Sequence, residues 1–260
     1  MKVWITGASS GIGEACAYRY ALQGASLVLT SSSKEKLDAV AEECLRRGAP
    51  DVAVLPYDLQ EPDGIEDLVT EAWSRMQGID VLFANAGISQ RTRVEDTSME
   101  MVRMIMEINY FAPVAIASAI LPRMIAAGGG NIAVTTSIAG RFGFPLRCAY
   151  SSSKFALYGF FESLQAENAR NGIHVTMVCP GRVRTNISLN ALYKGGVKYG
   201  RMDPGQAGGL DVDKAAARIV RAIRKDRREV LVGRKELLMV YIKRFFPGLC
   251  ARISNTLKPI

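Results

Sequence analysis

A tyrosine and a lysine four residues apart have the types and spacing that acid–base chemistry needs. Tyr150 and Lys154 stand in the run Tyr150-Ser151-Ser152-Ser153-Lys154, and this spacing puts both side chains on one face of a helix. The phenol of a free tyrosine has a pKa of about 10, so it is a poor proton donor at neutral pH. A neighbouring ammonium group stabilises the phenolate and lowers that pKa. The pair could therefore act as a general acid and base near pH 7.

A serine earlier in the chain could complete this pair. Ser137 ends the run Thr135-Thr136-Ser137, 13 residues before Tyr150. A hydroxyl there could bond a substrate oxygen and orient it toward the tyrosine. The Tyr-x-x-x-Lys spacing alone is common by chance on exposed helices, so its weight depends on the elements that precede it.

The most informative of those elements is a glycine-rich turn at the N-terminus. The run Thr6-Gly7-Ala8-Ser9-Ser10-Gly11-Ile12-Gly13 follows a short apolar segment and opens a helical pattern. Gly7 permits a tight turn, Gly11 lets the backbone approach a pyrophosphate, and Gly13 lets the helix pack close to a sheet. The helix N-terminus offers N–H groups and a positive dipole end to phosphates. In this order the turn favours a dinucleotide site over a purely structural turn.

The second apolar run ends without an acidic residue. It continues as Thr30-Ser31-Ser32-Ser33-Lys34, where a binder of NAD usually carries Asp or Glu for the ribose 2′-hydroxyl. Hydroxyls and a nearby lysine could instead hold a 2′-phosphate, which favours NADP over NAD. Ser31–Ser33 could also cap the next helix, and the two roles are compatible.

Short β-branched runs alternate with longer helical patterns along the chain. The expected strands are Val3–Thr6, Ser26–Thr30, Val52–Tyr57, Val81–Asn85, Ile132–Thr136, His174–Cys179 and Glu229–Val232. The expected helices are Gly11–Gln23, Lys34–Arg47, Ile65–Gln77, Ser98–Ala127, Ala149–Asn171 and Val212–Lys225. This alternation predicts an α/β fold with a doubly wound, Rossmann-type parallel sheet of about seven strands and helices on both faces.

The domain organisation follows from the same pattern. No Pro- or Ser-rich linker divides the chain, so residues 1–235 are expected to form a single Rossmann-type domain. Residues 186–210 are rich in Gly and polar residues and follow the sixth strand. This segment is expected to form a substrate loop at the carboxyl edge of the sheet, where ligands bind in this architecture. Together with residues 141–147 it would line the substrate pocket.

Charge is distributed unevenly along the 260 residues, of which 48% are hydrophobic and 22% charged. The formal net charge is +8. Residues 1–213 carry 20 basic and 22 acidic groups, whereas residues 214–260 carry 13 basic and 3 acidic groups. Nucleic-acid binding needs positive charge over the working face. A body with a net charge of −2 therefore argues against nucleic acid as a partner.

Cysteine and histidine usage narrows the chemistry further. The five cysteines are widely spaced without a Cys-x-x-Cys pair, which argues against a disulfide framework or zinc site and fits a reducing, cytoplasmic compartment. The single histidine, His174, cannot supply a His-rich metal site or a Ser-His-Asp triad, and no metal is expected. The N-terminal run lacks a signal-peptide pattern. No run approaches the roughly 20 apolar residues of a membrane-spanning helix.

Taken together, these motifs resemble those of the short-chain dehydrogenase/reductase family, in its classical type. The resemblance covers about residues 1–235 and rests on several motifs. They are Thr6–Gly13 for the cofactor, Asp58 for adenine, Asn85-Ala86-Gly87 for the sheet, Asn109 in a helix, the set Ser137, Tyr150 and Lys154, and Pro180–Thr185 for the nicotinamide. Ala84 stands where the family often has a second asparagine.

The resemblance implies hydride transfer between nicotinamide C4 and a carbonyl or alcohol carbon. Tyr150 would protonate the carbonyl oxygen, Lys154 would lower its pKa and bond the nicotinamide ribose, and Ser137 would polarise the carbonyl. Asn109 would link Lys154 through water to solvent. The expected cofactor-binding residues are Gly7, Ser9, Ser10, Gly11, Ile12, Gly13, Ser31, Ser32, Asp58, Leu59, Asn85, Ala86, Gly87, Tyr150, Lys154, Pro180, Gly181, Val183 and Thr185.

The carboxyl-terminal residues 236–260 form an apolar and basic extension. The stretch Glu236–Phe246 predicts a helix that Pro247-Gly248 stops, with Lys243 and Arg244 at its end and Arg252 and Lys258 beyond. This extension could lie on an anionic membrane, pack on a partner subunit, cover the substrate pocket, or pack on the core with a solvated basic rim. It is similar to the tails of family members that act on lipophilic substrates, which suggests a lipophilic ketone or alcohol.

Three function classes follow. The first is an NADP-dependent carbonyl reductase or alcohol dehydrogenase, expected to be a homodimer or homotetramer built on the two long helices. The second is a non-catalytic regulator that senses the dinucleotide, which would be expected to lack Tyr150 or Lys154. The third is a membrane or nucleic-acid adaptor, which rests on the carboxyl-terminal extension alone.

Overall fold

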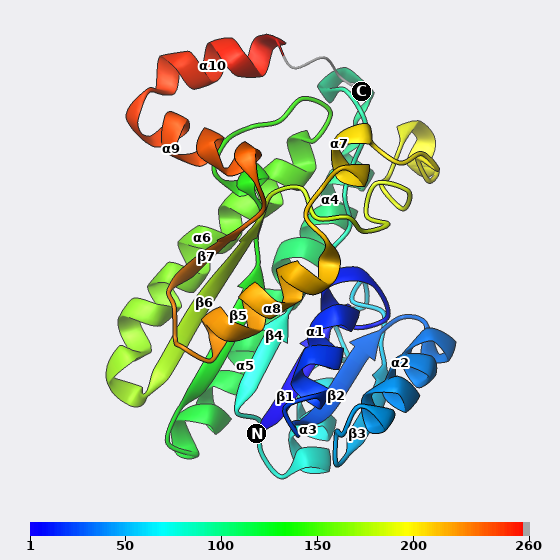
Figure 1. The fold of residues 1–260 in the computed structure, drawn as a ribbon, viewed down its shortest axis with the longest axis vertical. Coiled ribbons are helices and arrows are strands. Elements are labelled where there is room, and N and C mark those ends of the chain that lie inside the picture. Colours follow the sequence, from blue (N-terminus) through cyan, green and yellow to red (C-terminus); the bar gives the residue numbers. More distant parts are fainter. Residues whose placement is uncertain (257–260) are drawn as a thin grey trace.

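The computed structural model describes residues 1–256, and its centre is a sheet of seven parallel strands (Figure 1). The spatial order is β3-β2-β1-β4-β5-β6-β7. The strands are β1 (Lys2–Thr6), β2 (Ser26–Ser31), β3 (Val52–Pro56), β4 (Val81–Ala84), β5 (Gly130–Thr135), β6 (Ile173–Pro180) and β7 (Glu229–Val232). The expected Rossmann-type sheet is therefore confirmed, with the strand order reversing between β1 and β4.

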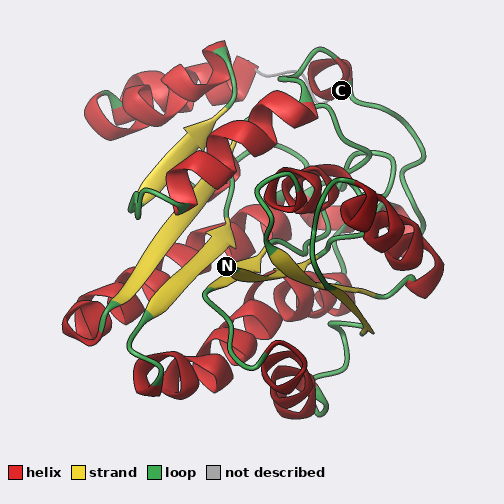
Figure 2. Cartoon of the chain, turned by 60° about the horizontal axis from the view of Figure 1, so that its bottom comes forward, coloured by secondary structure: helices red, strands yellow, loops and turns green. Residues whose placement is uncertain are grey.

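Helices cover both faces of this sheet (Figure 2). The α-helices are α1 (Gly11–Ala21), α2 (Lys34–Arg46), α3 (Ile65–Met76), α4 (Met99–Met106), α5 (Ala112–Ala126), α6 (Cys148–Asn168), α7 (Pro204–Ala207), α8 (Val212–Ile223), α9 (Leu238–Phe245) and α10 (Pro247–Thr256). Short 3₁₀ turns are Val94–Asp96, Ile138–Gly140, Ala169–Asn171, Lys194–Gly196 and Lys235–Leu237. One apolar cluster unites α1, α2 and α8 with one face of the sheet, and a second unites α3, α5 and α6 with the other.

Strand β1 shows how the sequence builds both layers. Its Val3 and Ile5 belong to the first cluster, whereas Trp4 belongs to the second, because successive strand side chains point to opposite faces. All three are fully buried, and the Trp4 indole donates to Thr30 Oγ1 at 3.0 Å. A strand buried on both faces reads as a continuous apolar run, which explains why these strands are visible in the sequence.

The predicted helix Ser98–Ala127 is continuous but not uniform. Between α4 and α5 the chain takes a π-helical turn, Glu107–Phe111, which inserts an extra residue into the helical repeat and often marks a functional site. Met99–Ala126 also contains an 18-residue window with the length and composition of a membrane span, whose mean hydropathy is 1.6 and of which 39% is buried. The expectation that no segment reaches this length was therefore wrong. Its Ile105, Ile116 and Ile120 are buried, as in a core helix.

The carboxyl-terminal extension also differs in part from the prediction. Helix α9 ends before Pro247 as expected, but Pro247 then opens α10, because proline suits the first position of a helix. The two helices lie beyond the carboxyl end of β7, at the same end of the molecule as α7 (Figure 1). Lys258 lies outside the described residues. The expected loop 186–210 contains the 3₁₀ turn Lys194–Gly196 and the short helix α7.

Candidate active site

A long cleft runs across the carboxyl ends of β1, β2 and β4, at the point where the strand order reverses. Its volume is about 400 Å³, and this is where open α/β sheets bind their ligands. Of the expected cofactor residues, the cleft is lined by Gly7, Ser9, Ser10, Gly11, Ile12, Ser31, Ser32, Asp58, Leu59, Asn85, Ala86, Gly87, Tyr150, Lys154 and Thr185. The cleft is also lined by Tyr57, Gln60, Ile88, Ser89, Ile108 and Thr135, which the sequence motifs did not indicate, and by Asn186, Ile187 and Asn190 of the expected 186–210 segment. Most of these directly flank predicted residues, and that adjacency is the signal that could have found them.

The glycine turn has the geometry that its sequence predicts. Gly7 has a φ of 65°, a left-handed conformation that glycine adopts without strain. A Cβ on Gly13 would lie 2.3 Å from the carbonyl oxygen of Gly7, so α1 can approach the turn this closely only with glycine there. Gly13 therefore does not line the cleft but shapes it from behind.

Asn85 ties the ends of three strands together beneath the cleft. Its side-chain amide donates to the carbonyl oxygens of Thr6 at 3.2 Å and Gly7 at 3.3 Å, and its Oδ1 accepts from Thr135 Oγ1 at 3.1 Å. These bonds join β4 to β1 on one side and to β5 on the other. The asparagine therefore holds the floor of the cleft rather than reaching a ligand from its edge.

The structure brings the four expected catalytic residues to one place. Ser137 follows β5, and Tyr150 and Lys154 lie in the first turns of α6. Lys154 is buried, and its Nζ donates to the carbonyl oxygen of Thr135 at 2.7 Å. Its Nζ lies 6.0 Å from the centroid of the Tyr150 ring.

Asn109 lies beside Lys154, in the π-helical turn. A Cβ built on Gly87 would meet Asn109 Oδ1 at 3.1 Å and Lys154 Nζ at 3.4 Å. Asn109 Oδ1 accepts from the N–H of Ile88 at 2.8 Å, and its amide donates to Ser153 Oγ at 3.0 Å. The π-helical turn thus directs a buried amide to the lysine of the predicted relay.

Gln90 is a buried positioning residue that the sequence analysis missed. Its Oε1 accepts from the backbone N–H groups of Ala149 at 2.9 Å and Tyr150 at 3.3 Å. It therefore satisfies two free donors at the N-terminus of α6 and fixes the turn that carries the tyrosine. Nothing in the sequence marks a lone glutamine for this role, because the contact joins residues about 60 positions apart.

The pKa values of Tyr150 and Lys154 differ from those that the sequence predicts. Burial raises the pKa of the Tyr150 phenol above its ordinary value. The Ser137 hydroxyl offsets part of that rise in the tyrosine pKa, followed by the charges of Arg147 and Arg91. Burial also lowers the pKa of the Lys154 ammonium to about 7. The positive charge that favours the phenolate therefore comes from Arg147 and Arg91, and the expected effect of Lys154 on the tyrosine pKa is not among the causes.

A second, smaller pocket of about 160 Å³ continues from the cleft past Tyr150. The expected segments 141–147 and 186–210 both contribute to its wall. Apolar side chains dominate one part of the lining, namely Ile138, Phe144, Pro145, Leu146, Val183 and Ile187. Pro180, Gly181 and Val183, predicted to contact the cofactor, line this pocket rather than the long cleft. The charged residues of the lining are Arg91, Arg147, Arg182 and Asp203.

Near the adenosine end of the cleft, Lys34 has a partner that the sequence did not indicate. Lys34, a candidate partner for a 2′-phosphate, pairs instead with Asp38 at 2.7 Å on an exposed face of α2. Ser31 and Ser32 do line the cleft. The N-cap of α2 is Ser33, whose side chain makes no capping bond, while Ser31 Oγ accepts from the backbone N–H of Ser33 at 3.3 Å. Within residues 1–256, no group of three or more His, Cys, Asp or Glu side chains is arranged to hold a metal.

Known proteins are similar to this chain in sequence and in architecture. The family model described as short chain dehydrogenase matches residues 1–193. Dehydrogenase/reductase SDR family member 7B of Bos taurus is 38% identical over 257 residues, covering 96% of this chain and 79% of the bovine protein.

Solved structures extend the similarity to three dimensions. An alcohol dehydrogenase from the archaeon Thermococcus sibiricus, complexed with 5-hydroxy-NADP, is 28% identical with a TM-score of 0.76, covering 89% of this chain and 95% of that one. A short-chain dehydrogenase/reductase from Burkholderia phymatum in complex with NAD has a TM-score of 0.84 at 22% identity, covering 95% and 94% of the two chains. The second likeness shows the fold alone.

Proposed function

Because the chain belongs to the short-chain dehydrogenase/reductase family, we propose that it transfers hydride between NADP(H) and a lipophilic ketone or secondary alcohol. The observation that carries this proposal is the position of Tyr150, which lines both the cofactor cleft and the adjoining pocket. A proton donor at that junction reaches a carbonyl oxygen in the pocket. The carbon of that carbonyl group then faces the nicotinamide end of the cleft. A bound nicotinamide would supply or accept the hydride.

Each of the four polar residues has a role in this proposal. Ser137 and Tyr150 bond the substrate oxygen, and Tyr150 donates its proton to that oxygen during reduction and takes it back during oxidation. Lys154 bonds the nicotinamide ribose. Asn109, beside Lys154, connects it through water to solvent. The serine and the arginines around Tyr150 offset part of the rise in the phenol pKa that burial causes.

The test of this function is turnover. The protein should oxidise NADPH, followed by absorbance, when given members of a panel of lipophilic ketones and aldehydes. A dinucleotide-sensing regulator would bind NADPH without turning over any carbonyl compound. That alternative is not favoured, because both Tyr150 and Lys154 are present and buried at the junction.

The cofactor preference rests on the end of β2. Ser31 and Ser32 line the cleft there, and the residues fit a dinucleotide because the glycine turn leaves room for a pyrophosphate at the start of α1. Residues 30–34, which span the usual position of a ribose-binding carboxylate, contain none, and Asp58, which also lines the cleft, is the acid expected at adenine. We therefore infer a preference for NADP(H) over NAD(H).

The variant Ser32→Asp tests this preference. The new carboxylate would repel a 2′-phosphate and accept a hydrogen bond from a free 2′-hydroxyl. We expect NADPH affinity to fall at least about tenfold, since a desolvated like-charge contact costs more than about 1.4 kcal/mol, while NADH affinity rises. Fluorescence titration with both nucleotides measures this, and Ser33→Asp, next to it but outside the cleft lining, is the control. Tighter binding of NADH than NADPH by the unaltered protein would contradict the preference.

The carboxyl-terminal extension supports a peripheral membrane contact. Its inner side, including Leu237, Val240 and Cys250, packs against the wall segment that carries Ile138 and Phe142. Its outer side exposes Leu238, Tyr241, Phe245, Phe246 and Leu249. Lys243 and Arg244 end α9 beside these side chains. An apolar surface bordered by cations suits the interface of an anionic membrane.

The double variant Phe245→Ser/Phe246→Ser tests this contact. Burying one phenylalanine contributes about 1.5–3 kcal/mol, so removing two exposed rings should lower vesicle binding at least about tenfold. Co-sedimentation with vesicles of phosphatidylserine and phosphatidylcholine gives the measurement. Leu22→Ser, at an exposed leucine after α1, should leave binding unchanged. Equal sedimentation of the double variant and the unaltered protein would refute the membrane contact.

The remaining proposals concern assembly and organisation. We take residues 1–235 as one catalytic domain and residues 236–260 as its extension, in a cytoplasmic protein without nucleic-acid partners. The expected dimer or tetramer would form through the Met99–Ala126 helix and α6. Exposed aromatic rings on both, Phe111 and Phe155, are suitable contacts for it.

A further inference from the structure

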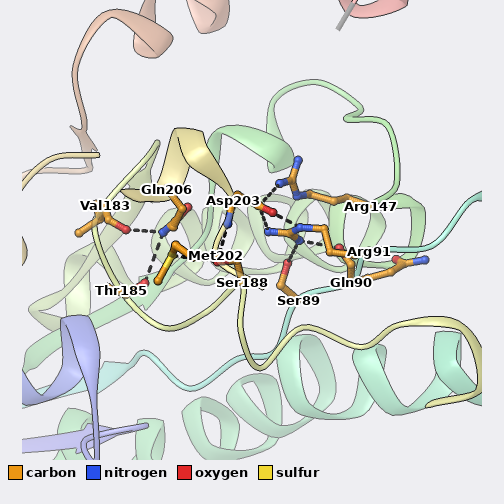
Figure 3. Close-up of polar contacts among 10 residues, drawn as sticks. All are labelled: Ser89, Gln90, Arg91, Arg147, Val183, Thr185, Ser188, Met202, Asp203 and Gln206. Carbon is orange, nitrogen blue, oxygen red and sulfur yellow. Dashed lines mark hydrogen bonds and ion pairs between the residues drawn. The ribbon is translucent and has the colours of Figure 1, made fainter. Parts of the chain in front are cut away.

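Three charged side chains from distant parts of the chain meet in the wall of the substrate pocket (Figure 3). Arg91 follows β4, Arg147 immediately precedes α6, and Asp203 immediately precedes α7. Asp203 Oδ2 accepts from Arg91 Nη2 at 2.5 Å and from Arg147 Nη2 at 3.0 Å. Only 4% of the Arg91 and Asp203 side chains and 22% of the Arg147 side chain are exposed. We call these three residues the arginine cluster.

Arg91 makes four hydrogen bonds in and beside this cluster. Its Nε and Nη2 both donate to Asp203, while its Nη1 donates to Ser89 Oγ at 2.8 Å and to the carbonyl oxygen of Gln90 at 2.6 Å. Arg91 and Asp203 therefore form a neutral pair in which four of the five N–H donors of Arg91 bind protein atoms. The pair anchors the 186–210 segment to the loop after β4.

Arg147 keeps a positive charge beyond the one that Asp203 neutralises, and it keeps N–H groups without an acceptor among the described residues. Its only hydrogen bond to the described residues comes from Nη2, so Nε and Nη1 find no acceptor within residues 1–256. Burial, followed by the charge of Arg91, lowers the pKa of Arg147 to about 10. Asp203 already neutralises Arg91, so the cluster keeps one net positive charge in a partly desolvated wall. Because 22% of the Arg147 side chain is exposed, water reaches part of this charge. An anion bound in the pocket would replace that water and pair with the guanidinium.

A second unfilled position lies in the same cluster. Asp203 Oδ1 is buried and accepts no hydrogen bond from the described residues. Buried polar atoms without partners are rare in folded proteins. A donor on a ligand, or a water that the ligand holds, would complete the cluster at this atom.

We propose that Arg147 binds a carboxylate of the substrate, so that the enzyme acts on oxo acids or hydroxy acids. This inference rests on the proposed hydride-transfer function and names its substrate class. Arg147 lies next to the first turn of α6, and Tyr150 lies within that turn, so the anion site and the proton donor are about one helical turn apart. The apolar residues Phe144, Pro145 and Leu146 lead up to Arg147 and would hold the carbon chain.

A carboxylate fits this site better than a phosphate or a neutral amide. Each edge of the Arg147 guanidinium pairs Nη2 with one nitrogen that has no acceptor in the described residues, Nε on one edge and Nη1 on the other. A carboxylate oxygen can accept from that nitrogen in a charge-assisted hydrogen bond. The cluster carries one net positive charge, which balances a monoanion but not a phosphate dianion. A neutral amide would leave the charge of Arg147 uncompensated. Arg182 also lines the pocket, but it is exposed, so solvent compensates its charge.

Binding of four six-carbon probes tests the proposal without requiring turnover. Hexanoate, hexanamide, hexanol and hexyl phosphate are titrated calorimetrically into the protein, with and without saturating NADP⁺. We expect hexanoate to bind about 10- to 100-fold more tightly than hexanamide or hexanol, the range for a charge-assisted hydrogen bond. Arg147→Gln should abolish this difference. Arg93→Gln, at an exposed arginine two residues after Arg91, should preserve it.

Several outcomes would overturn the proposal. They are equal binding of hexanoate and hexanamide, undetectable binding of hexanoate, an unchanged preference in Arg147→Gln, and tighter binding of hexyl phosphate than of hexanoate. The thermal melting curve of Arg147→Gln is recorded to establish that the variant is folded. The proposed hydride transfer fails separately, through absent NADPH binding or through absent NADPH oxidation with every carbonyl compound tested, oxo acids and neutral ketones alike. The probe titration depends on neither measurement.

Discussion

Tyr150→Phe should remove most turnover while leaving cofactor binding intact. The substitution deletes one hydroxyl and keeps the ring that lines the junction of the two cavities. A positioned acid–base group contributes about 10²- to 10⁴-fold to rate, so kcat should fall by about that factor. The affinity for NADPH should stay close to that of the unaltered enzyme, because the phosphates bind at the other end of the cleft. Steady-state kinetics and fluorescence titration measure the two quantities.

Tyr158→Phe is the matched control. Tyr158 lies on the same helix, α6, and is also buried, but its hydroxyl bonds Thr136 and Glu229. It lines neither the cofactor cleft nor the substrate pocket. Its loss of a hydroxyl should lower stability slightly and leave kcat nearly unchanged. Near-normal turnover by Tyr150→Phe on a substrate that the unaltered enzyme reduces well would remove the tyrosine from the chemistry.

Lys154 should make the stability of the cofactor-free protein depend on pH above neutrality. Burial lowers the pKa of its ammonium to about 7 in the folded state, whereas an unfolded lysine titrates near about 10.4. Between these values the unfolded state binds more protons than the folded state, so the free energy of unfolding rises with pH. Below pH 7 both states are protonated and this contribution to the pH dependence vanishes.

The variant Lys154→Met isolates that contribution. Other buried groups titrate in both proteins, so the difference in unfolding free energy between them reports on the lysine alone. Relative to the variant, the unaltered protein should gain roughly 1.5 kcal/mol between pH 7 and pH 8.5. Urea denaturation at several pH values measures this. Lys34→Met, at an exposed lysine, should show no such difference, and a constant difference for Lys154→Met would mean that the buried lysine keeps its proton.

Local signals made much of the cofactor cleft predictable. The turn Gly7–Gly13 and the tripeptide Asn85–Gly87 each place several ligand-facing atoms through consecutive residues. Their conformations depend on glycine geometry and on the end of one strand. Tyr150 and Lys154 were predictable for the same reason, since both lie on one face of one helix. What the sequence argument misjudged was the environment of Tyr150, because burial and the arginine charges come from other parts of the chain.

The substrate side was much less accessible to sequence analysis. Gln90, Arg91 and Asp203 carry no local pattern, and their meeting depends on how the loop after β4 and the 186–210 segment pack on α6. The π-helical turn that directs Asn109 toward Lys154 is likewise invisible in the helical periodicity, since one inserted residue barely alters an apolar pattern. The second helix of the extension, α10, was missed because Pro247 served as a stop signal although it also suits a helix start.

By itself, then, the amino-acid sequence determined the alternation of strands and helices, the glycine turn and the helix face that carries Tyr150 and Lys154. Each of these depends on residues close together in the chain, whose geometry is set by backbone sterics and side-chain periodicity. Only the tertiary structure decided which charges surround the phenol, that Arg147 lacks a full partner, and that the extension packs on the pocket wall. Those properties are sums over contacts between distant residues, so no local pattern encodes them.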